Sequence, residues 1–373
     1  MRNTIELGKI FGIQIRIDYS WFIIFLLITW SLASHYFPHY YPGWRPLTYW
    51  IVGLMTCLVF FASVLAHELS HSLVSRAHGI TVRDITLFIF GGAAQITSEP
   101  ERPGKEFLMA FAGPLVSIVI ALLFRFVVLL MASPAHPLSA LAYWLSRINL
   151  ILAMFNLIPG FPLDGGRLLR AVVWKISGNF KKATRIASVA GQFVAFLLIF
   201  FGMFMFFTAR FLNGIWFVFI GWFLNNAAER SYRLVALKDT MRGVTVEEAM
   251  VKECYGVSGD ITLEQLIYEH IIRGAYRCLP VIEEGRVVGL VTMHQVKEIP
   301  RHAWNTTTVR EVMIPLDKTK AVKPSDPLFS VFETMTREDI SQLPVVRDGE
   351  LVGIIGRDSI LSFIRTLSEL GIE

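Results

Sequence analysis

Long apolar stretches constrain this chain more than any other feature. A helix that crosses the hydrocarbon core of a bilayer, roughly 30 Å thick, needs about 20 mainly apolar residues. Such stretches recur in residues 1–240 of the 373-residue chain, and they predict a polytopic α-helical membrane protein with about six transmembrane helices. The charged fraction of 17% is low, since about 25% is usual in soluble domains. The predicted spans are 19–36, 47–73, 107–131, 138–158, 187–208 and the shorter 211–224.

The charge differs between the two parts of the chain. Residues 1–240 hold 20 Lys and Arg against 10 Asp and Glu, whereas residues 241–373 hold 15 against 20. Of the basic residues that flank the predicted spans, 17 lie on one side and only Arg45 and Arg210 on the other. The positive-inside rule then places both termini in the cytoplasm of a multi-pass protein of the cell membrane. Topology and anionic lipid headgroups explain the basic charge, and we expect no binding to nucleic acid.

Ionisable residues inside the second predicted span form an HExxH pattern, in which His67 and Glu68 are followed by His71. Residues four apart lie on one face of a helix, so both imidazoles can bind one cation while Glu68 reaches a water molecule beside it. An ionisable group near the centre of a span costs on the order of 2.5–3.5 kcal/mol on insertion scales, so a cluster requires a partner or a function. The alternative is that these residues only line an interface between helices.

A catalytic zinc site needs three protein ligands, and Asp164 is the candidate for the third. It lies in the sequence NLIPGFPLDGGR, residues 156–167, at the end of the fourth predicted span. The prolines and glycines end the helix, and irregular backbone at membrane depth is tolerated where protein or a water-filled cavity surrounds it. The residues alone leave open an ordinary Asp-Gly turn at the membrane boundary.

A short membrane-associated β-hairpin is predicted between the second and third spans. Strand-like residues 83–90 and 93–97 flank two glycines. The edge of such a hairpin could pair with an unwound substrate segment by strand addition, which makes Gly91, Gly92 and Ala93 candidate substrate-binding residues. The alternative is a plain connection between two helices.

The HExxH element in an early span, followed by Asn-x-x-Pro-x-x-Pro-x-Asp-Gly after a later one, resembles the site-2 protease family of intramembrane zinc metalloproteases, peptidase family M50. The resemblance covers about the first 225 residues. It implies that His67, His71 and Asp164 bind one zinc ion, that Glu68 is the general base and acid, and that Asn156 polarises the scissile carbonyl or holds the substrate. The implied activity is a zinc endopeptidase that cleaves transmembrane segments of membrane-anchored regulatory proteins, with the lipid bilayer as a second partner.

Residues 241–373 contain an internal repeat. The sequence LPVIEEGRVVGLV, residues 279–291, recurs as LPVVRDGELVGII, residues 343–355. Each copy predicts a strand, a tight turn, a strand and a helix, and neither copy of about 60 residues buries much surface alone. The repeats, about 241–304 and 305–373, resemble a CBS domain pair, a soluble α/β module. We therefore predict a transmembrane zinc metalloprotease domain, 1–240, and a cytoplasmic CBS domain pair, 241–373.

Many CBS pairs bind adenine nucleotides, but the family pattern Gly-h-h-Thr-x-x-Asp, in which h is apolar, is incomplete here. The first copy has Thr292 but Gln295 in place of the Asp. The second has Gly356 in place of the Thr, and its Asp358 is shifted by one position. The resemblance implies one partial nucleotide site at Thr292, or a regulatory or dimerisation module that makes a homodimer.

A CBS-gated transporter or channel is the alternative function. It would show an inverted repeat or polar residues along a pore, and we find neither.

Overall fold

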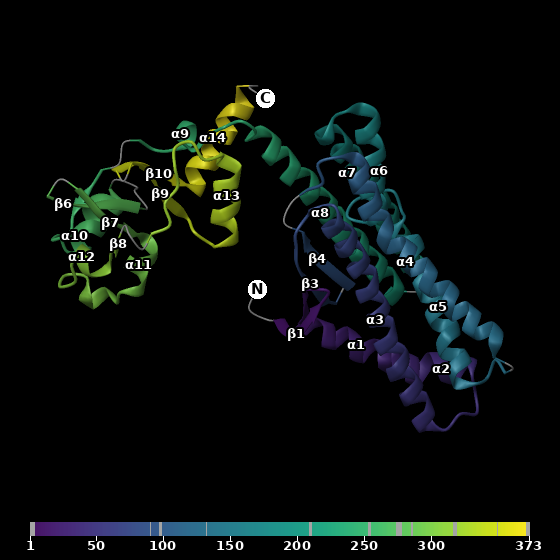
Figure 1. Cartoon of the computed structure of the whole chain (residues 1–373). Helices are drawn as coiled ribbons and strands as arrows, with labels where there is room; N and C mark the ends of the chain where they lie inside the picture. The colour runs from purple at the N-terminus through teal and green to yellow at the C-terminus, as the bar shows by residue number, and fades with distance from the viewer. Residues whose placement is uncertain are drawn as a thin grey trace. The chain divides into compact units, whose positions relative to one another are not determined.

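The computed structural model describes residues 4–89, 91–96, 99–131, 133–208, 211–252, 255–273, 278–284, 286–315, 319–348 and 350–370. The chain divides into two compact units, Met1–Val235 and Ala236–Glu373, which are described separately. Figure 1 shows that long helices dominate the first unit and that short helices and strands alternate in the second. Residues 90 and 97 of the predicted hairpin lie outside the described residues.

The first unit and the helix that leaves it contain four strands and eight α-helices within the described residues. In chain order these are β1 (Thr4–Ile10), β2 (Ile13–Asp18), α1 (Tyr19–Ser31), the π-helical turn η1 (Leu32–Tyr36), α2 (Phe37–Tyr40), α3 (Pro46–Ala77), β3 (Val82–Phe88), β4 (Gly91–Ile96), α4 (Pro103–Leu130), α5 (Pro137–Asn156), α6 (Asp164–Ser177), α7 (Phe180–Phe207) and α8 (Phe211–Thr240).

Five helical segments among the described residues are long and apolar enough to cross a membrane. They are Tyr19–Tyr40, Pro46–Ala77, Pro103–Leu130, Pro137–Asn156 and Phe180–Phe207, and they match the first five predicted spans. The sixth predicted span, 211–224, forms the first part of α8 and is not among them. Its apolar stretch is shorter than the about 20 residues that a span needs, and the helix continues into a charged segment.

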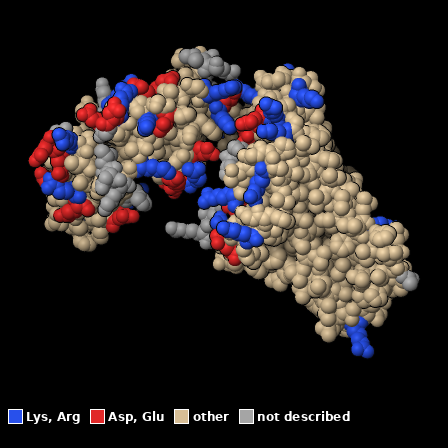
Figure 2. Space-filling view, viewed as in Figure 1, with Lys and Arg blue, Asp and Glu red and all other residues tan. Residues whose placement is uncertain are grey.

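The outer surface of these helices is apolar. Leu129 of α4 and Phe200 of α7 are 69% and 72% exposed. Figure 2 shows a long stretch of this unit almost without charged side chains, where Figure 1 places α3, α4 and α5. A contiguous apolar surface of this extent is rare on soluble proteins and suits contact with lipid.

The four strands of the first unit form one sheet in the order β1-β2-β3-β4. β3 and β4 pair antiparallel, with Leu87 opposite Gly92, so the predicted hairpin is present. Gly91 and Gly92, which were expected to connect the two strands, instead begin the second strand. β1 and β2 were not predicted from the sequence. β2 runs parallel to β3, and its alternating residues Ile13, Ile15 and Ile17 are buried, as expected for a strand with one buried face. β4 is the last strand of the sheet.

α4 is the helix around which the membrane part packs. It contacts α3, α5 and α6, and its buried residues include Ala110, Gly113 and Ser117. Small residues at this spacing allow helix backbones to approach closely. Proline occupies the first position of α3, α4 and α5, where its missing N–H would have no helical partner in any case.

The second unit contains two sheets and several short helices. Its elements are α9 (Val246–Ala249), β5 (Val257–Ser258), α10 (Leu263–Gln265), the π-helical η2 (Leu266–Ile272), β6 (Cys278–Glu283), β7 (Arg286–Thr292), α11 (Met293–Glu298), the 3-10 turn η3 (Arg301–Ala303), α12 (Val309–Val312), β8 (Ile314–Pro315), α13 (Leu328–Arg337), β9 (Gln342–Arg347), β10 (Glu350–Gly356) and α14 (Arg357–Glu369). The sheets have the orders β5-β6-β7-β8 and β10-β9.

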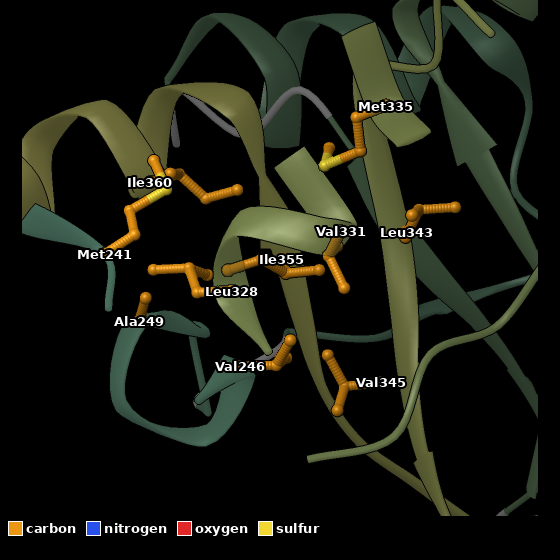
Figure 3. Close-up of a cluster of buried hydrophobic side chains, with 10 residues drawn as sticks. All are labelled: Met241, Val246, Ala249, Leu328, Val331, Met335, Leu343, Val345, Ile355 and Ile360. Atoms are coloured by element: carbon orange, nitrogen blue, oxygen red, sulfur yellow. The ribbon is translucent and has the colours of Figure 1, made fainter. Parts of the chain in front are cut away.

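The two repeats exchange their first helices. Val246 and Ala249 of α9, which begin the first repeat, lie in a hydrophobic core made mainly by the second repeat, as Figure 3 shows. Val309 of α12, which begins the second repeat, lies in the core of the first. Backbone hydrogen bonds follow the same exchange, since the N–H of Val246 donates to Asp326 and that of Val309 donates to Ile261, both at 3.0 Å.

Candidate metal centre

Two histidines on one face of α3 form the centre of the site. α3 runs unbroken from Pro46 to Ala77. His67 and His71 lie one turn apart and are 3% and 8% exposed. Their Nε2 atoms are 3.2 Å apart. The helix therefore directs both imidazoles to one point, which is the arrangement that the HExxH spacing predicts.

Asp164 brings a third ligand atom to the same point. Its Oδ2 atom lies 3.2 Å from His67 Nε2 and 3.1 Å from His71 Nε2. Within the described residues, this is the one group of His, Cys, Asp or Glu side chains close enough together to hold a metal ion.

The three atoms fit the geometry of a zinc ion. With bonds of about 2.0–2.1 Å, a tetrahedral zinc holds neighbouring ligand atoms about 3.3 Å apart, close to the distances of 3.1–3.2 Å found here. Gly113 of α4 faces the same point, because a Cβ atom there would lie 2.6 Å from His67 Nε2 and nearer still to His71 Nε2. Glycine leaves room beside the imidazoles. Two imidazoles and one carboxylate are also a donor set found in catalytic zinc sites.

Contacts from α4 orient both imidazoles. His71 Nδ1 lies 2.6 Å from the carbonyl oxygen of Met109. Because a carbonyl only accepts, Nδ1 carries the proton and Nε2 of the neutral ring keeps a free lone pair. His67 Nδ1 is 2.9 Å from the hydroxyl oxygen of Ser117, which can accept the corresponding proton. Metal-binding histidines usually have an outer partner of this kind.

Close backbone packing holds Asp164 at the start of α6. A Cβ atom on Gly165 would lie 2.5 Å from the carbonyl carbon of Leu157, and one on Gly166 would lie 2.7 Å from the oxygen of Gly160. Only glycine fits at these two positions, so the preceding segment folds tightly over the first turn of the helix. The Asp-Gly-Gly sequence therefore begins a helix beside the histidines instead of forming a free turn.

The predicted substrate-binding residues lie beside Glu68. Gly91, Gly92 and Ala93 begin β4. A Cβ atom on Gly92 would lie 3.1 Å from Glu68 Cδ and nearer still to its Cγ, whereas one on Gly91 would meet no heavy atom within 4 Å in the described part of the chain. Gly92 thus contacts the Glu68 side chain, and an edge strand passes the residue next to His67.

Asn156 has no hydrogen bond to the three ligand atoms among the described residues. It is the half-buried last residue of α5, at the start of the segment that leads to Asp164. None of the hydrogen bonds found among the described residues joins its side chain to that carboxylate or to either imidazole.

Thr292 belongs to the second unit and ends β7. Its backbone N–H donates to Gln295 Oε1 at 3.0 Å, and its hydroxyl contacts the same oxygen. Thr292 lines a cavity of about 850 Å³. Two basic side chains that line this cavity are already paired, because Lys320 binds Glu338 at 2.7 Å and Arg357 binds Asp339 at 3.0 Å. A phosphate group would compete with these carboxylates for the two cations.

Sequence reasoning missed the contribution of α4 to the site. Met109 and Ser117 lie far from the HExxH motif in the chain, and no motif connects them to it. Gly113 lies in the sequence Ala112-Gly113-Pro114, which forms part of the resemblance to site-2 proteases, but its place beside the imidazoles was not predicted. One signal was present. Two small residues four positions apart in a span of bulky apolar residues are typical of close helix packing, which would have marked this face of α4 as a contact surface.

Comparisons with known proteins match both parts of the chain. The model of peptidase family M50 matches residues 55–135 and 131–201, and the CBS domain model matches 246–301 and 309–366. Rip3 of Mycobacterium tuberculosis, named as a zinc metalloprotease, is 34% identical over 95% of this chain and 91% of its own. A zinc metalloprotease of Synechocystis, sll0528, is 36% identical over 98% and 97%. The solved site-2 protease of Methanocaldococcus jannaschii is 31% identical and covers 61% of this chain and 95% of its own, with a TM-score of 0.43.

Proposed function

This chain belongs to peptidase family M50, the site-2 proteases, and on that premise we propose that it cleaves transmembrane segments of membrane-anchored regulatory proteins, as in regulated intramembrane proteolysis. It is a multi-pass membrane protein and a zinc metalloprotease with a CBS domain pair. The observation that carries the proposal is the approach of three ligand atoms within 3.1–3.2 Å of one another, in the unit that holds the apolar helices. A hydrolytic site among such helices suits a substrate that also lies in the membrane.

We propose His67, His71 and Asp164 as the ligands of one zinc ion per chain. When bound, the ion polarises a peptide carbonyl and lowers the pKa of a water molecule. Glu68 follows the first ligand on α3, and we propose that its carboxylate takes a proton from the attacking water and delivers it to the leaving amine. α4 fixes the tautomer of His71, so that the ring is ready to bind a cation.

The substrate is proposed to pair with β4. A helical segment keeps its backbone N–H and C=O groups bonded internally, so it must unwind before a peptide bond can be attacked. An edge strand supplies replacement hydrogen bonds. Because Gly92 of β4 contacts Glu68, a strand added there would pass the general base. Gly91, Gly92 and Ala93 are accordingly proposed to bind the substrate backbone.

Asn156 is proposed to act on the same substrate. It stands at the end of α5, where the helix gives way to the segment that precedes Asp164. Its amide N–H could donate to the scissile carbonyl or to a neighbouring backbone carbonyl.

The orientation in the membrane is proposed from the charge distribution. With 17 basic flanking residues on one side of the spans and two on the other, both termini and the CBS pair face the cytoplasm. The metal centre would then be supplied with water from a cytoplasmic opening.

The CBS pair is proposed to regulate the protease or to join two copies of it. The cavity beside Thr292 is large enough for a small ligand. The ion pairs of Lys320 and Arg357, and Gln295 in place of the motif Asp, do not favour an adenine nucleotide. A CBS-gated transporter or channel is not supported, because the relatives that match nearly the whole chain are metalloproteases.

The test compares wild type with Glu68→Gln in detergent. Zinc content is measured by metal analysis, and activity by cleavage of a model transmembrane substrate. Glu68→Gln should keep its zinc and lose about 10²–10⁴-fold in cleavage rate, which is the range for loss of a general base. Glu101→Gln, which changes an exposed carboxylate paired with Lys105, is the matched control and should behave as wild type.

Two results would contradict the assignment. Full cleavage by Glu68→Gln would exclude Glu68 as the general base. Loss of zinc from that variant would instead mean that Glu68 helps to hold the metal, in which case loss of cleavage would say nothing about proton transfer.

A further inference from the structure

A buried ion pair joins α4 to α6 near the metal centre. Arg170 of α6 donates to Glu106 Oε1 of α4 from Nε at 2.7 Å and also from Nη2. The two side chains are 7% and 2% exposed. The other carboxylate oxygen, Glu106 Oε2, has no hydrogen-bond partner among the described residues. The hydrolytic mechanism proposed above uses neither residue.

Arg170 also contacts two aromatic rings. Its guanidinium carbon lies 4.9 Å from the ring centre of Phe161 and 4.6 Å from that of Phe180, within the range of cation–π contacts. Phe161 lies in the segment just before Asp164, and its N–H donates to the carbonyl of Ala187 in α7 at 3.1 Å. Arg170 therefore lies where α4, α6, α7 and the segment that leads to Asp164 meet.

α4 and α6 each hold part of the ligand set. α4 orients both imidazoles through a hydroxyl group and a backbone carbonyl, and α6 begins with Asp164. We propose that the Glu106–Arg170 pair is a positioning device that sets the distance between the Asp164 carboxylate and the two imidazoles. This inference rests on the proposed assignment of these three residues as zinc ligands.

Stability alone does not explain the pair. Removal of two charges from water costs free energy that their attraction scarcely repays, so well-packed apolar side chains would usually hold two helices at least as firmly. The unpartnered Glu106 oxygen adds to that cost. The hydrogen bonds of a guanidinium are directional, however, and they fix how one helix is rotated against another. Arg170 lies about 9 Å along α6 from Asp164, so a rotation of α6 at this point would turn the ligand away.

The experiment measures the zinc affinity of the full chain in detergent by chelator competition, together with thermal unfolding of the metal-free protein. Arg170→Lys keeps the charge but loses the planar guanidinium. We expect zinc affinity to fall 10- to 100-fold, as is typical when the outer support of a metal ligand is lost, with little change in unfolding temperature. The double variant Glu106→Met with Arg170→Met should unfold at or above the wild-type temperature, because apolar packing replaces the ion pair, and it should show the same loss of zinc affinity.

Two further variants separate the explanations. Asp84→Asn removes an equally buried carboxylate, 1% exposed and bonded by Arg16, from β3 of the same unit, and it should leave zinc affinity unchanged. Wild-type affinity in the double variant, or an equal loss in Asp84→Asn, would overturn the positioning role. If the double variant fails to fold, Arg170→Lys decides alone, because wild-type zinc affinity in that variant would also overturn the positioning role. Asp164→Ala is measured alongside, because wild-type zinc binding by that variant would refute the ligand assignment itself.

Discussion

The tautomer of His71 depends on the backbone of a different helix. Its Nδ1 atom donates to the carbonyl of Met109 at 2.6 Å, so the ring presents Nε2 as a lone pair before any cation arrives. A substitution of the Met109 side chain would leave this hydrogen bond in place, because the acceptor is main chain. The support for this ligand therefore depends on how α4 packs on α3. It cannot be recognised from the identity of residue 109, because any residue supplies the same carbonyl.

Gly113 gives a direct test of where the metal lies. A Cβ atom at this position would lie 2.6 Å from His67 Nε2 and closer to His71 Nε2, in the space beside the ligand atoms. Gly113→Ala should therefore reduce zinc content from about one ion per chain to a small fraction and abolish cleavage. Metal analysis of the purified protein and a cleavage assay measure both effects.

The matched control for Gly113→Ala is Gly104→Ala on the same helix. A Cβ atom on Gly104 would meet no heavy atom within 4 Å among the described residues, and alanine in a helix is usually favoured over glycine. Gly104→Ala should keep its zinc. A Gly113→Ala protein with full zinc content would place the ion elsewhere.

At the residue scale, the sequence predicts which side chains meet only where they lie close together in the chain. The period of a helix brings His67 and His71 together, so one span predicts their approach. Asp164 required a second motif, and the residues alone left its role open. The contacts of Ser117 and Gly113 with the imidazoles could not be predicted, because the packing of α3 on α4 is three-dimensional and no local pattern encodes it.

At the scale of elements, the contact between β4 and α3 predicts a separate effect. A methyl group on Gly92 would overlap Glu68 Cγ and push the carboxylate from its place. Gly92→Ala should therefore resemble Glu68→Gln, with zinc retained and cleavage reduced by about 10²–10⁴-fold. The same contact means that larger substitutions at Gly92 cannot by themselves test strand addition.

Gly91→Ala separates the two explanations for a defect at Gly92. Gly91 has a positive φ of 126°, which strains any side chain, but its Cβ atom would not touch Glu68. Gly91→Ala should cleave faster than Gly92→Ala. Equal losses in the two variants would point to distortion of β4 instead of displacement of Glu68.

Local patterns predicted some elements and not others. The hairpin of β3 and β4 followed from strand-like residues around two glycines. β1 and β2 were not predicted, although Ile13, Ile15 and Ile17 alternate as strand residues do. β2 and β3 pair in parallel although two complete spans separate them in the chain, and sequence gives no measure of such a distant contact.

At the scale of the whole molecule, residues 1–240 and 241–373 differ in net charge, and the structure divides the chain near the same point, after Val235. The basic excess belongs to the first part and the acidic excess to the second. The sequence repeat in the second part was evident, but it does not coincide with the hydrophobic cores. α9 contacts α13 and α14, so the first helix of one repeat completes the core of the other. A repeat seen in sequence defines homology between segments and not the units that fold together.

This exchange predicts which fragment of the second part can fold. Every residue of the core around Leu263, from Val257 to Val309, lies within residues 255–315, whereas the first sequence repeat, 241–304, lacks Val309 and exposes Val246. Fragment 255–315 should therefore unfold cooperatively on heating, and fragment 241–304 should show a broad transition or none. Circular dichroism measures both, with fragment 241–373 as the intact control. Cooperative unfolding of 241–304 at the same temperature as 255–315 would show that the exchanged helix contributes little. Fragment 255–315 is expected to be the more stable of the two because Val309 is 0% exposed in the native core, and its loss leaves a cavity.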